Sequence, residues 1–176
     1  MLSTRYTITE DQLLIAKLYN TSTNPSIKKR RLLSWLMIPV LYGVLGYIFW
    51  ANGSEKMVYF FFAFSFLWIL LYPFWEGNRF KKSYKNGLKR SSKDILDKDN
   101  VITFGDQITI VSGEQTENYT YQELNQLVAI KNYVLFLFPK ERTIAVPHEK
   151  MPDEILQFLQ KEKSIPLTVR PGWKWR

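Results

Sequence analysis

His148 is the only histidine of the chain, and the chain has no cysteine. A zinc site with two histidine ligands, a thiolate metal site, a thiol nucleophile and a disulfide framework are therefore all excluded. Any histidine-based catalytic triad would depend on His148 alone, but this residue follows Pro147 in an expected turn between a strand and a helix, with no catalytic motif around it. We therefore interpret His148 as a solvated turn residue.

Three aspartates could suggest a calcium loop. Asp97, Asp99 and Asp106 are close in the sequence, but the EF-hand spacing fails. Val101 stands where the loop needs an oxygen ligand, and Ile102 stands where it needs glycine. We therefore expect no metal site in this segment.

The remaining catalytic motifs are also missing or isolated. Residues 26–29 match S-x-x-K, but they lack its companion motifs and lie in an expected loop. The sequence has neither a P-loop nor a dinucleotide-binding glycine pattern. It therefore predicts no catalytic residue, no metal ligand and no cofactor, and we expect a protein that is not an enzyme.

Charge is distributed unevenly along the chain. The 176 residues carry a formal net charge of +8, with 46% apolar and 23% charged residues. Residues 1–31 carry +4, residues 32–75 are neutral overall, residues 76–93 carry +6 and residues 94–176 carry −2. A nucleic-acid-binding domain would need its basic side chains over one face of a folded module. We therefore expect no nucleic-acid partner.

Two segments are long and apolar enough to cross a membrane. Residues 32–50 and 57–75 are nineteen residues each and contain no charged side chain. As helices they would each extend about 28 Å, close to the roughly 30 Å hydrocarbon core of a bilayer. Their Leu, Ile, Val and Phe residues favour insertion by about 3–7 kcal/mol per segment. We predict a transmembrane hairpin over residues 32–75; the alternative is a pair of buried helices in a soluble bundle.

The flanking charges predict the orientation of this hairpin. Residues 51–56 are a short turn, and four basic residues precede the first span while seven follow the second. Because basic residues stay on the cytoplasmic side, both termini should be cytoplasmic. A cleaved signal peptide does not fit, since about thirty polar residues precede the first apolar segment. Neither span contains a charged residue or a histidine, which disfavours transport by the hairpin alone.

The residues before the first span, 1–31, should form a cytosolic strand and helix. In residues 2–8, Leu2, Tyr6 and Ile8 share one face of a strand, in a half-buried alternation. Thr9 and Gln12 form a capping box that should open a helix ending near residue 20, followed by a loop over residues 21–26. We expect the strand to pair with the carboxy-terminal sheet, because otherwise its edge would be unpaired.

Residues 76–98 should continue the second span as a basic juxtamembrane helix. The seven basic side chains of residues 79–93 could each attract anionic lipid by about 1 kcal/mol near the membrane surface. The alternative is that they only set the topology. The candidate lipid contacts are Arg79, Lys81, Lys82, Lys85, Lys89, Arg90 and Lys93.

Residues 99–169 have the pattern of a small β domain. Six short β-rich runs over residues 101–104, 107–111, 116–121, 124–130, 133–138 and 142–146 alternate with turn residues. An amphipathic helix follows, with Pro152 in its first turn. We predict an α+β membrane protein: the transmembrane hairpin plus a bent antiparallel sheet or partial barrel, capped by the last helix in the order of a pleckstrin-homology (PH)-like domain. The aromatic residues of these strands should form a core.

The order of segments resembles the YcxB-like family of small bacterial membrane proteins, which have a polar strand and helix, two spans with a short loop, and a cytosolic domain. The resemblance covers essentially the whole chain and rests on residues 102–104, 108–110, 119–124, 132–138 and 143–147. It implies a multi-pass protein of the bacterial inner or plasma membrane with a PH-like carboxy-terminal domain. It supplies no functional residue.

Residues 170–176 form a separate tail. Tryptophans between basic residues suit a membrane interface or the groove of a partner. The alternatives are a frayed tail, or Trp173 packed on the domain. The candidate interface residues are Trp173, Lys174, Trp175 and Arg176.

These features predict a membrane-anchored, non-enzymatic binding or regulatory protein. Its PH-like domain would engage lipid headgroups or a partner protein at the membrane. Its expected partners are the lipid bilayer, anionic lipid, and a membrane protein or a second copy of the chain. The alternatives are an accessory subunit of a transporter or membrane enzyme, and a self-protection (immunity-type) membrane protein.

Overall fold

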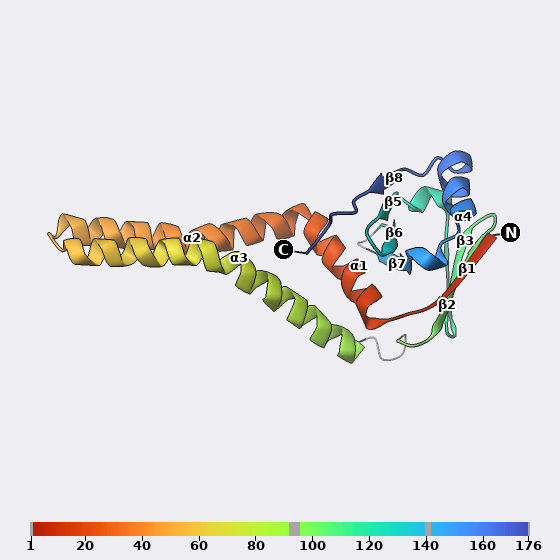
Figure 1. Ribbon diagram of the computed structural model, residues 1–176, viewed down its shortest axis with the longest axis horizontal. Coiled ribbons are helices and arrows are strands. Elements are labelled where there is room, and N and C mark those ends of the chain that lie inside the picture. The colour runs from red at the N-terminus through yellow and green to blue at the C-terminus, as the bar shows by residue number, and fades with distance from the viewer. Residues whose placement is uncertain (1, 92–95, 140–141, 176) are drawn as a thin grey trace. The chain divides into compact units, whose positions relative to one another are not determined.

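The computed structural model describes residues 2–91, 96–139 and 142–175, with only the backbone of residues 89–91 (Figure 1). The chain is α+β and forms two compact units. The β unit comprises Met1–Asn20 and Ser83–Lys174, and the helical unit comprises Thr21–Lys82 and Trp175–Arg176. The helical unit is thus an insertion between the two parts of the β unit.

Two long helices build the helical unit. Helix α2 spans Pro25–Ala51, and α3 spans Glu55–Ser91, so α3 continues into the β unit. They form an antiparallel hairpin: Trp35 Nε1 donates to the carbonyl of Ile69 at 3.2 Å. The predicted continuation of the second apolar segment as a helix is confirmed up to Ser91, whereas residues 96–98, which were expected to belong to it, are not helical.

The turns at both ends of α2 are shorter than the sequence suggested. Only Asn52–Ser54 separate α2 from α3, with Gly53 at φ +76°, where glycine is favoured. The expected loop over residues 21–26 is wrong, because α1 (Glu10–Thr23) ends just before α2 and leaves only Asn24 between them. Asn24 Oδ1 caps α2 by accepting hydrogen bonds from the amides of Ser26 and Ile27, and Pro25 suits the first helical position.

The apolar side chains of the hairpin face outward. Of the exposed large apolar side chains that the structure describes, all except Val169 belong to α2 or α3. The most apolar windows of the two helices have a mean hydropathy of 1.9, and 6% and 0% of their residues are buried. By length and composition, both helices could cross a membrane.

Two four-stranded sheets form the β unit. The first has the order β1-β2-β3-β4, with β1 at Leu2–Thr7, β2 at Asp99–Phe104, β3 at Ile108–Ser112 and β4 at Gln115–Tyr119. The second has the order β7-β6-β5-β8, with β5 at Gln126–Ala129, β6 at Tyr133–Leu137, β7 at Thr143–Pro147 and β8 at Leu167–Val169. All pairs are antiparallel except β5 and β8.

The predicted pairing of the amino-terminal strand is confirmed. Strand β1 pairs with β2 along its whole length, with Leu2 opposite Phe104 and Tyr6 opposite Asn100. Tyr6 and Ile8 are buried in the main core. The capping box before α1 is also confirmed, because Gln12 Oε1 accepts from the Thr9 amide at 2.7 Å and Thr9 Oγ1 accepts from the Gln12 amide at 3.4 Å.

The end of the β unit differs from the sequence-based expectation. Helix α4 spans only Asp153–Gln157, after Pro152, and continues as a π-helical turn over Phe158–Glu162. Two short 3₁₀ turns lie at Tyr121–Glu123 and His148–Lys150, so the strand expected over residues 116–121 ends earlier. Strand β8 was not predicted, because its three residues are too few for a recognisable alternation.

Candidate functional site

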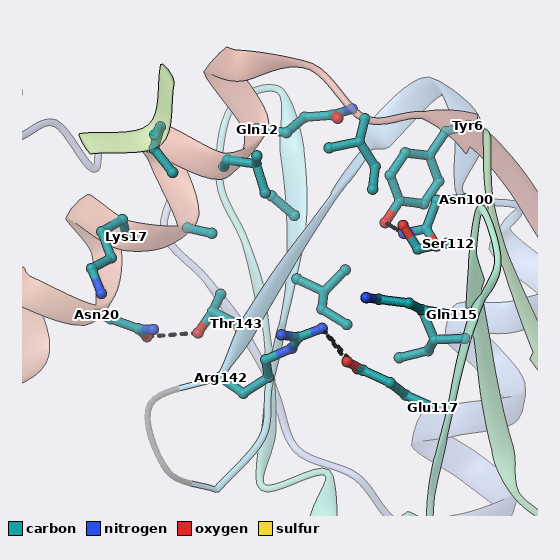
Figure 2. A pocket seen from close by; sticks show the side chains of 17 residues that line it. Tyr6, Gln12, Lys17, Asn20, Asn100, Ser112, Gln115, Glu117, Arg142 and Thr143 are labelled. Atoms are coloured by element: carbon teal, nitrogen blue, oxygen red, sulfur yellow. Dashed lines mark hydrogen bonds and ion pairs between the residues drawn. The ribbon is translucent and has the colours of Figure 1, made fainter. Parts of the chain in front are cut away.

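A cleft of about 240 Å³ opens within the β unit (Figure 2). Its lining comes from α1, from the first part of β7 and from all four strands of the first sheet, together with Ile8 after β1, Leu88 of α3 and Arg142 before β7. Apolar side chains form much of the wall, among them Ile8, Leu13, Ile110 and Ile144. A concave, mainly apolar site with a few convergent polar groups is typical of ligand-binding clefts.

One row of polar residues crosses the first sheet at this cleft. Tyr6 on β1 lies opposite Asn100 on β2, Asn100 lies opposite Ser112 on β3, and Ser112 lies opposite Gln115 on β4. All four line the cleft. The row two residues further along is more apolar, since Ile102 lies opposite Ile110. The strand register thus places hydrogen-bonding groups together at one end of an otherwise largely apolar face.

Tyr6 and Asn100 are hydrogen-bonded and buried. Asn100 Nδ2 donates to the Tyr6 hydroxyl at 2.6 Å. Asn100 is 3% exposed, and Tyr6 is 4% exposed. Burial raises the pKa of the Tyr6 phenol, against smaller lowering effects of the Asn100 hydrogen bond and the Arg142 charge. The phenol is therefore neutral at physiological pH and can accept or donate a hydrogen bond.

Two other polar atoms of this row have no protein partner. Asn100 Oδ1 and Ser112 Oγ are buried, and neither forms a hydrogen bond with any part of the chain that the structure describes. Leaving a buried polar group unsatisfied costs about 1–3 kcal/mol. Both atoms belong to residues that line the cleft, so a small rotation of the two side chains would let a group bound there recover this cost by hydrogen bonding.

The charged residues of the cleft belong mainly to an ion pair. Arg142 Nη2 donates to Glu117 Oε2 at 2.7 Å and to Glu117 Oε1 at 2.9 Å (Figure 2). The side chain of Arg142 is 51% exposed, and that of Glu117 is 35% exposed. The hydroxyl of Tyr119 also donates to Glu117 Oε2, at 2.9 Å. Lys17 on α1 is the third charged residue of the lining, and its Nζ lies 6.0 Å from the centre of the Tyr84 ring.

A hydrogen bond joins α1 to β7 beside the cleft. The Thr143 hydroxyl donates to Asn20 Oδ1 at 2.6 Å, and both residues line the cleft. Ala16 and Tyr19 of the same helix belong to a second apolar cluster with residues of the second sheet. Helix α1 is therefore fixed against that sheet, and it holds its side of the cleft in place.

The residues that the sequence offered as candidates for catalysis or metal binding do not line the cleft. His148 is exposed in its 3₁₀ turn, where its backbone amide donates to the carbonyl of Asn132. Among the described residues, no group of three or more His, Cys, Asp or Glu side chains could hold a metal ion. Sequence reasoning missed the cleft, although Asn100 and Ser112 carried a signal: each is a polar residue at a position whose parity within the strand predicts burial.

The basic residues of α3 are described in part. Arg79, Lys81 and Lys82 are exposed in the helical unit, and the Arg79 guanidinium lies 5.2 Å from the centre of the Trp75 ring. Lys85, in the β unit, has its Nζ 3.8 Å from Glu10 Oε1. The side chains of Lys89 and Arg90, and the whole of Lys93, lie outside the described residues.

The two tryptophans of the tail pack in different units. In the β unit, the Trp173 ring lies 5.4 Å from the Tyr19 ring, centre to centre, while Lys174 is exposed. In the helical unit, Trp175 Nε1 donates to the Gly77 carbonyl at 2.9 Å. The Arg31 guanidinium lies 5.0 Å from the centre of the Trp175 ring. Arg176 lies outside the described residues.

No model of a known protein family, no curated protein sequence and no solved structure matches the chain.

Proposed function

We propose that this chain is a membrane-anchored, non-enzymatic binding protein. In this proposal α2 and the apolar part of α3 cross the bilayer, and the β unit binds a ligand in its cleft on the cytoplasmic side. The observation that carries the proposal is the outward-facing apolar surface of the hairpin, combined with a β unit that has its own core and its own cleft.

The exposed apolar surface supports a membrane rather than an aqueous environment. Core helices of a soluble protein bury their apolar windows, whereas here 6% and 0% of the two windows are buried. Exposed apolar patches of soluble monomers rarely exceed a few hundred Å². Lipid would cover this surface along the hairpin, because a helix satisfies most of its backbone polar groups internally. The Ile69 carbonyl, which Pro73 leaves without its helical donor, accepts instead from Trp35 Nε1 of α2.

The orientation of the hairpin follows from charge. Lys28, Lys29 and Arg30 are exposed in the first turns of α2, and Arg79, Lys81 and Lys82 are exposed in α3. The turn at the other end of the hairpin is flanked only by Glu55 and Lys56. The positive-inside rule then places both termini in the cytoplasm. The resemblance to the YcxB-like family supports the bacterial inner or plasma membrane as the location.

The same resemblance supports a PH-like origin for the β unit. Two sheets followed by the short helix α4 agree with the order expected for such a domain. Strand β8, which follows α4 and runs parallel to β5, is an addition to that order. Binding at the membrane surface, to a small ligand or to a partner, would be the role of this unit.

Single-cysteine variants test the membrane part of the proposal, because the native chain has no cysteine. Ser54→Cys, in the hairpin turn, should react with an impermeant thiol reagent added to intact cells. Gln107→Cys, exposed in the β unit, should react only after the cells are opened. Reaction at both positions or at neither in intact cells, or release of the chain from membranes by alkaline carbonate, would contradict the proposal.

A further inference from the structure

We infer that the cleft selects an uncharged ligand whose carboxamide or hydroxyl group is held by Asn100 and Ser112, with an apolar stem along Ile8, Ile110 and Ile144. This inference rests on the proposed binding function of the β unit and goes beyond it by naming the ligand class. It excludes the phosphate of a lipid headgroup as the group that reaches the polar row.

The hydrogen-bonding capacity of the polar row matches a neutral group. Asn100 Oδ1 can accept a hydrogen bond, and the Ser112 hydroxyl can both donate and accept. A carboxamide can donate its N–H to Asn100 Oδ1 while its carbonyl accepts from the Ser112 hydroxyl. A hydroxyl can make the same two contacts with its proton and its lone pairs. Either group would satisfy the two buried atoms that the described chain leaves unsatisfied.

The electrostatics of the row disfavour a charged group there. Tyr6, Asn100, Ser112 and Gln115 are all uncharged at neutral pH, and burial raises the pKa of the Tyr6 phenol further above its ordinary value. The charged residues of the lining are Lys17, Glu117 and Arg142. Glu117 already accepts two hydrogen bonds from Arg142, so their charges largely cancel. Lys17 lies on α1, and its Nζ is 6.0 Å from the centre of the Tyr84 ring rather than on the sheet that carries the row. A phosphate or carboxylate at the row would therefore lose its hydration without gaining an opposite charge beside it.

The walls and the size of the cleft define the rest of the ligand. Ile8 and Ile110 are buried on the first sheet, and Ile144 on β7 is also part of the lining. A water molecule takes up about 30 Å³ in the liquid, so a cleft of about 240 Å³ accommodates a head group together with a short apolar stem. The ligand is therefore amphipathic and neutral at its inner end.

Three probes of similar shape test the ligand class: pentanamide, pentanoate and pentylamine, which are neutral, anionic and cationic at pH 7. The full chain, in lipid nanodiscs and labelled at isoleucine methyl groups, is titrated with each probe by NMR. Pentanamide should shift the methyl signals of Ile8, Ile110 and Ile144, and should leave Ile165, which is buried outside the lining, unchanged. Its affinity should exceed that of either charged probe by about tenfold or more.

A serine pair separates hydrogen bonding from general packing. Ser112→Ala removes the buried hydroxyl from the cleft, whereas Ser3→Ala removes an exposed hydroxyl from β1 and serves as the matched control. Ser112→Ala should weaken pentanamide binding by about tenfold without lowering the melting temperature, because its hydroxyl has no partner to lose. Ser3→Ala should leave binding unchanged.

The outcomes distinguish the ligand class from the binding function. If pentanoate or pentylamine binds at the same methyl groups as tightly as pentanamide, the cleft binds ligands but the inferred class is wrong. If none of the three probes shifts these methyl groups, both the inferred class and the proposed binding function of the cleft are wrong. Unchanged pentanamide affinity in Ser112→Ala would also overturn the inference.

Discussion

Arg31 Nε donates a hydrogen bond to Glu76 Oε2 at 2.8 Å, and this ion pair joins α2 to α3 across 45 residues of sequence. The Tyr72 hydroxyl donates to the other carboxylate oxygen at 3.2 Å. Glu76 is 8% exposed, so its carboxylate is shielded from water at the point where the uncharged segments of both helices end. The Arg31 side chain is 22% exposed, so the pair is partly buried. Such a pair favours one register of two apolar helices, whose packing contacts alone would tolerate sliding.

Replacing Glu76 with glutamine should destabilise the hairpin by about 2 kcal/mol, because the guanidinium of Arg31 loses its carboxylate partner and can donate only to a neutral amide oxygen. The measurement is the unfolding of the full chain in mixed micelles by a denaturing detergent. Glu55→Gln, at an exposed position of the same helix, is the control and should change little. Equal stability of the two variants would contradict a structural role for the ion pair.

The amino-terminal strand should be essential to the β unit. Ile8 is 6% exposed and packs in the main core, so Ile8→Ala should lower the free energy of unfolding by about 3 kcal/mol. Arg5→Ala, on the exposed face of β1, is the matched control and should cost much less. Deleting residues 2–9 should remove cooperative unfolding of the β unit altogether. Cooperative unfolding at an unchanged midpoint in the deletion variant would show that the pairing of β1 with β2 is dispensable.

The elements with strong local signals were predictable from the sequence. Residues 2–8 alternate except for the polar Thr4 on the buried face, and the Thr9–Gln12 capping box satisfies backbone donors within a single turn, so both could be identified without tertiary information. The continuity of α1 up to Thr23 was not predictable, because Thr, Ser and Asn residues favour loops and caps when considered locally. Strand β8 was missed because its short pairing depends on β5, which is remote in sequence.

The cleft could not be predicted because it depends on register between strands. Tyr6 is 94 residues from Asn100, and the two meet only because β1 pairs antiparallel with β2. The sequence did contain a local signal, since Asn100 and Ser112 have the same strand parity as the apolar Ile102 and Ile110, although both lie just outside the strands expected over residues 101–104 and 107–111. That signal identifies a buried polar residue, but its hydrogen-bond partners follow from the fold.

Tyr6 should make the stability of the β unit fall at alkaline pH. Burial raises the pKa of Tyr6 above its ordinary value of 10.0. Below about pH 10 both the folded and the unfolded chain hold this proton, so the Tyr6 contribution is constant. Above that value the unfolded chain loses the proton first, and the free energy of unfolding falls with pH until the folded pKa is reached, by up to about 1.4 kcal/mol per pH unit.

Urea unfolding of the full chain in micelles at several pH values between about 9 and 11.5 measures this dependence. In Tyr6→Phe the fall above pH 10 should be shallower, and the absorbance change of tyrosine ionisation that accompanies unfolding should decrease by one residue. A residual slope is expected in the variant, because burial also raises the pKa of Tyr19 and Tyr133. Identical slopes in the two proteins would show that Tyr6 ionises equally in the folded and unfolded chain.

The exposed basic residues of α3 should retain anionic lipid if they do more than set the topology. Lys81 and Lys82 are both exposed, and each would contribute about 1 kcal/mol to the attraction near an anionic surface. Native mass spectrometry of the purified full chain should therefore show fewer bound anionic lipids in the Lys81→Gln, Lys82→Gln double variant. The difference should shrink as ionic strength rises, because charges are screened over about 8 Å at physiological salt.

The control is the double variant Lys131→Gln, Lys150→Gln, which removes the same charge from exposed positions of the β unit and should retain the wild-type number of lipids. Equal lipid retention in both double variants would leave orientation of the hairpin as the role of these charges.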